Sequence, residues 1–363
     1  MQGTVYSKIK KTVSYFIKTI RESDFQKTLK SEYHELQEFY FEKQQRDHLL
    51  SVSIIKRFFL IIWWLLKSLF MRLTPVRKVL LILGLILLFS VSITGVGNVQ
   101  VNNNSIIGAS LLLFILLLEL KDKLLARSEL SEGRAVQNAL LPQDIPQING
   151  WDVWFYSMPA NDVGGDLVDY IKISNQRFAF ILSDISGKGL GAALLMAKLQ
   201  SIFRALAPDY NSPTLFVSKI NSVFYRDSLK KSFASLVYLE VQPGSDTIRF
   251  VNAGHLPPFH LSGRSIKELS KGERALGLSE KVDYKEHILT LAKGDLLFIY
   301  SDGLTEAINK DDEFFENRLK EILPVLPQLS AEKGGKWVVD VVEKYIGAAK
   351  VHDDLSLLIL KKT

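Results

Sequence analysis

Three apolar runs that each meet a carboxylate decide how this sequence folds. Residues 178–189 read FAFILSDISGKG, residues 296–306 read LLFIYSDGLTE, and residues 353–360 read DDLSLLIL. A short, continuous apolar run is typical of a strand that is buried on both faces. The acidic residues at the ends of these three predicted strands are Asp184, Asp302, Asp353 and Asp354.

The pattern around these runs, after Gly150, predicts one layered domain. Strands are expected at Trp151–Met158, Leu167–Ile173, Arg177–Ser183, Ala234–Val241, Ile248–Asn252, Leu296–Ser301 and Asp354–Lys361. Helices are expected at Gly189–Leu206, Thr214–Leu229, Phe314–Leu323 and Lys336–Ala349. Because strands cluster and helices cluster, an α+β fold is favoured over a doubly wound parallel sheet.

The acidic residues predict a metal site. A further acidic pair lies in GGDLVD, residues 164–169, and the chain has no cysteine. Burying several carboxylates together is costly unless a cation compensates them. An all-oxygen site suits Mg²⁺ or Mn²⁺ better than zinc. Two such ions could activate one water for in-line attack on a phosphoryl group, and no nucleophile, Walker A or kinase motif offers another route.

Residues 134–361 resemble the SpoIIE/RsbU-like branch of the bacterial metal-dependent protein phosphatases, within the protein phosphatase 2C superfamily. The matching segments occur in the family's order: Gln137–Pro142, Val163–Asp169, Asp184–Gly189, Ala192–Ala197, Asn252–Pro258, Gly294–Ala307 and Asp353–Leu358. The resemblance implies an αββα sandwich with a binuclear metal site between its sheets. It also implies hydrolysis of phosphoserine or phosphothreonine on a protein, usually a STAS-type anti-sigma-factor antagonist.

The same resemblance implies which residues hold the two Mn²⁺ or Mg²⁺ ions. The expected ligands are the carboxylates of Asp166, Asp184, Asp302 and Asp353 and the carbonyl of Ile185. This sequence departs from the family pattern at Leu167-Val168 and at Ser356, which are not expected ligands. An active enzyme is therefore expected, and a catalytically weak pseudophosphatase that acts as a membrane-tethered signalling or binding module is the alternative.

Four further residues are expected near the ligands rather than on the metal. Asp169 and Asp354 are the carboxylates of this kind. His255 either belongs to the loop structure or acts in catalysis directly. Lys188 either attracts a phosphorylated partner or is a solvated lysine in a turn.

The N-terminal part of the chain predicts a membrane anchor. Residues 1–141 carry 19 Lys and Arg against 11 Asp and Glu, out of 45 and 39 in the whole chain. Val79–Val96 is expected to span a bilayer, and Ile106–Leu118 is expected to return after an uncharged loop. Both outer flanks are basic, which places them on the cytoplasmic side. A pair of buried core helices is the alternative, and no nucleic-acid-binding motif is present.

Two segments beside this hairpin carry further hypotheses. Phe58–Leu66, with Trp63 and Trp64, either lies in the membrane interface or forms part of a further span over Phe58–Met71. The helix that follows the hairpin has an apolar stripe at Leu130, Val136, Leu140 and Leu141. Such a stripe predicts a partner, either the same helix of a second chain in a homodimer or the phosphatase domain. A passive spacer is the alternative.

The expected organisation has five parts along the chain. They are a cytoplasmic helical region (1–53), a basic and aromatic membrane-interface segment (54–78), a transmembrane helical hairpin (79–120), a helical regulatory linker (121–147) and the phosphatase domain (148–363). The expected location is the inner cell membrane, with the phosphatase domain in the cytoplasm. A rival hypothesis makes the N-terminal region the main functional part, as a membrane sensor.

Overall fold

The protein forms two compact units, Met1–Lys123 and Leu124–Thr363. The structure, a computed structural model, describes residues 52–89, 103–228, 232–347, 349 and 351–363. The expected helical region 1–53 lies almost wholly outside the described residues, and so does most of the expected loop 98–105. The unit boundary groups all but the first three residues of the predicted linker (121–147) with the phosphatase domain.

The first unit contains α4 (Ile54–Arg72), α5 (Pro75–Phe89) and the start of α6 (Asn103–Leu140). Helices α5 and α6 approach closely at two glycines, because a Cβ atom on Gly108 would lie 2.6 Å from the Gly84 carbonyl oxygen. Such small-residue crossings are frequent between membrane helices. In the first turn of α5, the Arg77 guanidinium contacts the carboxylates of Glu119 and Asp122 on α6, each at 2.6 Å.

Two helices of the described residues are long and apolar enough to cross a membrane, Asn104–Leu140 and Leu190–Asp209. The second packs Met196 and Phe203 into the core of the phosphatase unit, so its apolar character is that of a core helix. The first contains the predicted span Ile106–Leu118, and the structure continues the same helix through most of the predicted linker. The other predicted span, Val79–Val96, is described only as far as Phe89.

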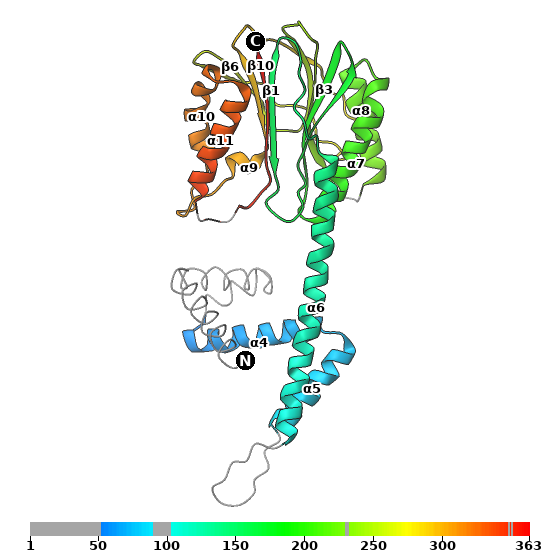
Figure 1. Ribbon diagram of the computed structural model, residues 1–363, viewed down its shortest axis with the longest axis vertical. Helices are drawn as coiled ribbons and strands as arrows, with labels where there is room; N and C mark the ends of the chain where they lie inside the picture. Colours follow the sequence, from blue (N-terminus) through cyan, green and yellow to red (C-terminus); the bar gives the residue numbers. More distant parts are fainter. Residues whose placement is uncertain (1–51, 90–102, 229–231, 348, 350) are drawn as a thin grey trace, which may run out of the picture. The chain divides into compact units, whose positions relative to one another are not determined.

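The second unit is built on two antiparallel five-stranded sheets (Figure 1). The first sheet has the strand order β1-β10-β9-β6-β7, and the second has the order β2-β3-β4-β5-β8. The strands are β1 (Trp151–Met158), β2 (Leu167–Ser174), β3 (Arg177–Ile185), β4 (Ala234–Val241), β5 (Thr247–Ala253), β6 (Phe259–Ser262), β7 (Ser265–Glu268), β8 (His287–Thr290), β9 (Leu296–Tyr300) and β10 (Leu355–Lys362).

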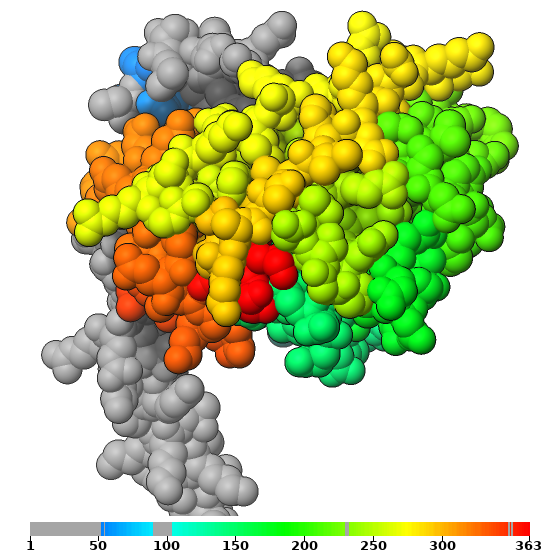
Figure 2. Space-filling model, turned by 90° about the horizontal axis from the view of Figure 1, so that it is seen from above, coloured from blue at the N-terminus to red at the C-terminus, as the bar shows by residue number. Residues whose placement is uncertain are grey.

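Helices cover the outer face of each sheet. Those on the second sheet are α7 (Leu190–Leu206), the short η1 (Ala207–Asp209) and α8 (Pro213–Asp227). Those on the first are α9 (Asp302–Thr305), α10 (Glu316–Ile322), η2 (Leu323–Gln328) and α11 (Ala331–Ile346). Figure 2 looks onto the end of the sandwich, where the red C-terminal residues lie between the orange and green helical layers.

Three hydrophobic cores follow from these four layers. One lies between the two sheets and contains Phe180, Ile299 and Leu358. The other two join each sheet to its own helices, with Trp154 in one and Phe203 in the other. The expectation of an α+β, αββα sandwich is thereby confirmed.

The differences from the predicted elements occur where local sequence signals are weak. The strands β6, β7 and β8 were not predicted, because four residues are too few for an alternating pattern to be recognised. Helix α11 begins five residues earlier than predicted, since the Ser330 hydroxyl caps it by accepting a hydrogen bond from the Lys333 amide. Gly335, in the next turn, leaves room for the Trp154 ring.

Candidate active site

The predicted ligands lie at one end of the sandwich because their strands end there. Leu167 of β2 pairs with Ser183 of β3, so Asp166 and Asp184 share one end of neighbouring strands. In the facing sheet, β9 and β10 pair through Tyr300 and Leu357. Asp302 lies two residues after β9 and Asp353 two residues before β10. Because these strands are antiparallel, both residues lie at the same end of the pair. The topology therefore brings carboxylates from four strand ends together.

Hydrogen bonds of Ser301 connect the ends of β9 and β10. The Ser301 hydroxyl donates to the Asp354 carbonyl at 3.0 Å and accepts from the Ser356 amide at 2.9 Å. The Ser301 amide donates to the Ser356 carbonyl at 2.9 Å. Gly303 lets the first turn of α9 approach the Asp354 backbone, because a Cβ atom there would collide with the Asp354 carbonyl. Asp302 and Asp353 are thus held on a rigid support.

Asp354 holds the loop that carries Asp166. Its carboxylate accepts hydrogen bonds from the backbone amides of Ala160 at 2.8 Å, Gly165 at 2.6 Å and Asp166 at 3.3 Å. A Cβ atom on Gly164 would lie 2.6 Å from the same carboxylate, so a side chain at this position would push the loop away. Asp354 therefore positions Asp166 through the backbone, and its neighbour Asp353 is left to face the pocket.

The loop after β3 supplies the other side of the pocket. Gly187 and Gly189 have φ angles of 101° and 71°, a conformation that strains any residue with a side chain. A Cβ atom on Gly165 would lie 3.2 Å from the Ile185 carbonyl oxygen, which shows that this carbonyl faces the loop of Asp166. The expected carbonyl ligand Ile185 therefore lies beside Gly165, the residue that precedes Asp166.

Burial and mutual repulsion shift the acidity of this cluster. Burial, then the charges of Asp184 and Asp354, raise the pKa of Asp166 well above its usual range. Burial and the carboxylates of Asp302 and Asp353 raise the pKa of Asp184 to about 7. Burial, Asp353 and Glu306 raise the pKa of Asp302 to about 6. Burial is the largest cause of each shift, and the neighbouring carboxylates add to it.

These residues fit a divalent cation. The buried Asp166 Oδ2 has no hydrogen-bond partner, although buried polar atoms normally have one. The donor set consists of oxygen atoms, which magnesium and manganese prefer. Within the described ranges, no three His, Asp or Glu side chains already converge as closely as a complete metal site would require. The site is thus a set of coupled carboxylates on a rigid scaffold rather than a closed cage.

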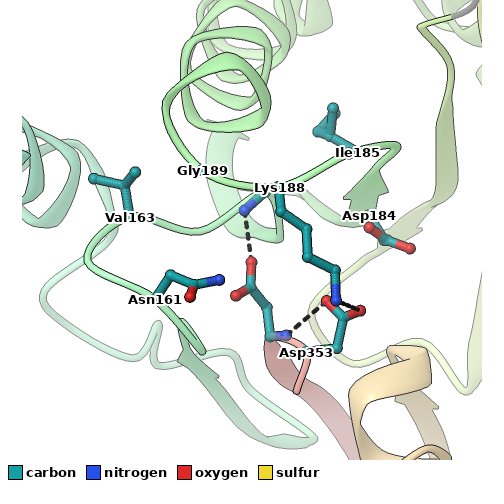
Figure 3. Close-up of a pocket in the computed structure, with 10 residues that line it drawn as sticks. Asn161, Val163, Asp184, Ile185, Lys188, Gly189 and Asp353 are labelled. Atoms are coloured by element: carbon teal, nitrogen blue, oxygen red, sulfur yellow. Dashed lines mark hydrogen bonds and ion pairs between the residues drawn. The ribbon is translucent and has the colours of Figure 1, made fainter. Parts of the chain in front are cut away.

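The remaining candidates lie in three different environments. Asp169 is fully buried and contacts Arg204 through both carboxylate oxygens at 2.7 Å, with Gln200 at 2.9 Å. The buried His255 uses both ring nitrogens, on the Ser235 hydroxyl at 2.7 Å and the Tyr300 carbonyl at 3.0 Å. Burial lowers the pKa of His255 to about 4, so its ring is neutral. The third, Lys188, lies in the pocket beside Asp353 (Figure 3).

One contact beside the site was not predicted from the sequence. The Gln137 amide at the end of α6 donates to the Gly164 carbonyl at 2.7 Å and accepts from the Gly164 amide at 3.1 Å. Gln200 of α7 donates to the Leu140 carbonyl at 2.7 Å. The end of α6 is therefore bonded to the loop that carries Asp166. A single glutamine in a helix carries no sequence signal for such a contact.

The family follows from a comparison with known proteins. The family model described as Stage II sporulation protein E (SpoIIE) matches residues 174–363, which is more than half of the chain. The chain belongs to the SpoIIE family. The resemblance drawn from the sequence motifs is confirmed, and so is the expectation of a PP2C-type protein serine/threonine phosphatase, a metal-dependent class.

Relatives support this membership. Phosphoserine phosphatase RsbU of Bacillus subtilis is 26% identical over 238 residues, covering 65% of this chain and 70% of RsbU. Phosphoserine phosphatase RsbP of the same organism is 25% identical over 190 residues, covering 51% of this chain and 47% of RsbP. Protein IcfG of Synechocystis is 25% identical over 265 residues, and the match spans 41% of its length.

Solved structures show the same fold. The PP2C domain of SiaA from Pseudomonas aeruginosa superposes with a TM-score of 0.59 at 19% identity, covering 67% of this chain and 99% of that domain. The RsbU and RsbW domains of a Mycobacterium tuberculosis protein superpose with a TM-score of 0.52 at 20% identity. That match covers 61% of this chain and 63% of the other.

Proposed function

We propose that this SpoIIE-family chain is a membrane-anchored phosphatase that hydrolyses phosphoserine or phosphothreonine on a cytoplasmic protein. The observation that carries the proposal is the set of buried, mutually repelling carboxylates at the strand ends, with an orphaned oxygen on Asp166. Divalent cations would neutralise such a cluster near neutral pH, where its carboxylates otherwise repel each other. The proposed cofactor is two Mn²⁺ or Mg²⁺ ions.

Some residues of the chain would bind the ions, and others fix the positions of these ligands. Asp166, Asp184, Asp302, Asp353 and the Ile185 carbonyl would hold the ions. Such ions lower the pKa of a water and neutralise charge on a phosphoryl group. Asp354, together with Ser301, fixes the backbone around these ligands. His255 is engaged by Ser235 and Tyr300, which favours a structural role over a direct catalytic one.

The substrate proposed for this activity is a phosphorylated STAS-type anti-sigma-factor antagonist. The support is the similarity to RsbU over 65% of this chain. The test is release of phosphate from such a protein by the full-length chain in detergent with Mn²⁺, with the Asp184→Asn variant as the control. A wild-type chain that binds Mn²⁺ without releasing phosphate from any phosphoserine protein would favour the alternative, a pseudophosphatase that serves as a binding module.

The membrane anchor is proposed to be the pair α5 and α6, with both of its outer flanks in the cytoplasm. Exposed apolar side chains on α6, such as Leu113, Leu116 and Leu117, suit a lipid environment, and the Gly84–Gly108 approach suits membrane packing. Reporter fusions after residue 50 and after residue 363 should both give a cytoplasmic signal. Opposite signals would show an odd number of spans and would contradict the hairpin.

The segment before this pair is proposed to lie on the membrane surface. Helix α4 exposes Phe58, Phe59 and Trp63 beside the cations Lys56 and Arg57. An amphipathic helix with aromatic residues and basic flanks binds at the headgroup level. A tryptophan quenching experiment with lipids brominated at different depths tests this location, and quenching greatest at the bilayer centre would indicate a span instead.

The linker is proposed to regulate the phosphatase, either within one chain or through a homodimer. Val136 and Leu140 stay 62% and 41% exposed, while Leu141 packs on the core of the second sheet and Gln137 bonds Gly164. The exposed part of the stripe remains open to a second copy, and the buried part is docked on the domain. Replacing Val136 with a charged residue should lower the oligomeric state if the stripe forms a dimer.

A further inference from the structure

The Lys188 ammonium forms an ion pair with Asp353, which is one of the expected metal ligands. Its Nζ atom lies 2.8 Å from Asp353 Oδ2 (Figure 3). It also donates to the His352 carbonyl at 2.7 Å. Lys188 comes from the loop between β3 and α7, while Asp353 lies two residues before β10 of the facing sheet. This one side chain therefore ties together the two loops that form the pocket.

Lys188 is the cationic residue in a lining that also contains Asp184, Asp353 and Asp354. The hydrogen bond to Asp353 raises the pKa of Lys188, so its side chain stays charged. Its charge also lowers the pKa of Asp302, against the larger effects that raise it. The lysine thus neutralises part of the same carboxylate cluster that is expected to bind the ions.

A lysine and a divalent ion cannot use the same face of Asp353. A magnesium or manganese ion binds a carboxylate oxygen at about 2.1 Å, and an ammonium held at the same oxygen would be strongly repelled by it. The lysine is free to leave, because its side chain is 57% exposed. A Cβ atom on Gly187 or Gly189, which flank it, would meet no other atom within 4 Å.

We propose that Lys188 is an internal competitor for the metal, which neutralises Asp353 in the metal-free protein and has to release it when the ion binds. The proposal rests on the proposed metal-dependent function. It makes Lys188 a positioning residue for Asp353 that sets the metal concentration at which the site fills. Neither of the sequence hypotheses for Lys188, a solvated turn or a phosphate attractant, includes this role.

The size of the effect follows from the exposure of the pair. A partly exposed ion pair contributes little, and removing a neighbouring positive charge also favours a divalent ion, so the Lys188→Met variant should bind Mn²⁺ about three- to tenfold more tightly. The difference should shrink as salt is raised, because salt screens the ion pair. Lys188→Arg keeps the charge and should stay close to the wild type.

Isothermal titration calorimetry of the 363-residue chain in detergent with MnCl₂ measures the affinity for Mn²⁺ directly and does not depend on phosphatase activity. The matched control is Lys336→Met, which removes an exposed lysine paired with Glu332 at 2.6 Å on α11. Circular dichroism and thermal unfolding of each variant show whether it is folded. The control should bind Mn²⁺ as the wild type does.

The outcomes separate this proposal from the proposed function. Tighter binding in Lys188→Met alone supports the competitor. Unchanged or weaker binding in a folded Lys188→Met variant overturns it, and weaker binding would show that the lysine organises the loop for the metal. Absence of Mn²⁺ and Mg²⁺ binding in the wild type and in every variant would instead overturn the metal-dependent function itself.

Discussion

Asp166 and Asp169 lie three residues apart and are both buried, yet their surroundings are opposite. Asp169 makes a two-point ion pair with Arg204 and accepts a further hydrogen bond from Gln200. Asp166 has no cationic side-chain partner in the part of the chain that the structure describes, and its Oδ2 atom has no hydrogen bond. One carboxylate joins β2 to α7, while the other faces a cluster of like charges.

The same contrast separates Glu240 from Asp184. Glu240 is buried on β4, accepts from the Tyr238 hydroxyl at 2.6 Å and lies 3.5 Å from Arg249. Asp184 ends the neighbouring strand among Asp302, Asp353 and Asp354. Where the fold needs a buried carboxylate for its own stability, it supplies a cation or a donor from a nearby element. Where it does not, the balancing charge is expected from solution.

The largest effect should follow from neutralising one of the carboxylates that lack a cationic partner, called here the unbalanced set. Asp184→Asn should lower kcat/KM toward a phosphoserine protein by at least roughly 10³-fold, because the charge that holds the metal is lost. Phosphate release at saturating Mn²⁺ measures it, and removing metal from the wild type with EDTA should reproduce the loss. Turnover of Asp184→Asn near the wild-type value would contradict the metal assignment.

Neutralising a buried carboxylate should change the stability of the protein in opposite directions, depending on whether the carboxylate lacks a cationic partner, as Asp184 does, or has one, as Asp169 does. In metal-free protein at pH 8, Asp184→Asn should raise the free energy of unfolding by about 1–2 kcal/mol, since it removes repulsion. Asp169→Asn should lower it by about 2–4 kcal/mol, since Arg204 loses its partner. Thermal unfolding of both full-length variants with EDTA measures the difference. If both substitutions destabilise the protein, the distinction between the two sets fails.

The unbalanced set should also make metal binding depend on pH. The pKa values of Asp184 and Asp302 are raised to about 7 and about 6, so both carboxyls hold protons in acid that the metal has to displace. The affinity for Mn²⁺ should rise about tenfold or more between pH 5.5 and 7.5 and level off above that range. Calorimetric titration at several pH values measures the slope. A flat profile would show that these carboxyls do not bind the ion.

The same shifts determine how the metal-free protein responds to pH. Carboxyl pKa values that are raised on folding contribute stability that is present below the unfolded values and lost as pH rises through about 6 to 7. Saturating Mn²⁺ should remove this loss, because it stabilises the ionised form. Thermal unfolding at pH 5 and pH 8, with and without Mn²⁺, therefore provides an independent check on the calorimetry.

The smallest effect concerns the contact between α6 and the loop of Asp166. Gln137→Ala removes both hydrogen bonds to Gly164 and should raise the Mn²⁺ concentration for half-maximal activity about three- to tenfold. The matched control is Gln143→Ala, since Gln143 bonds only the nearby carbonyls of Asn138 and Leu141. Equal metal requirements for the two variants would make the linker a passive spacer.

Much of the layered fold was predictable because its central strands are continuous apolar runs. The bounds of the central strand β4 match the predicted ones, and β3 extends the prediction by only two residues. Burial on both faces forces such runs to be apolar, and this signal is local. The short strands β6 and β8 owe their pairing to neighbours far along the chain, which no local pattern reports.

The sequence by itself determined that acidic residues end buried strands, and hence that a metal site of oxygen ligands was expected. Only the tertiary structure decided what each carboxylate does. Asp353 and Asp354 are adjacent and chemically identical, yet one faces Lys188 while the other holds three backbone amides of the Asp166 loop. Asp169 likewise became a structural ion pair because α7 brings Arg204 to it. The partner of a charged side chain depends on how distant segments of the chain pack together, and the local spacing of residues does not predict that packing.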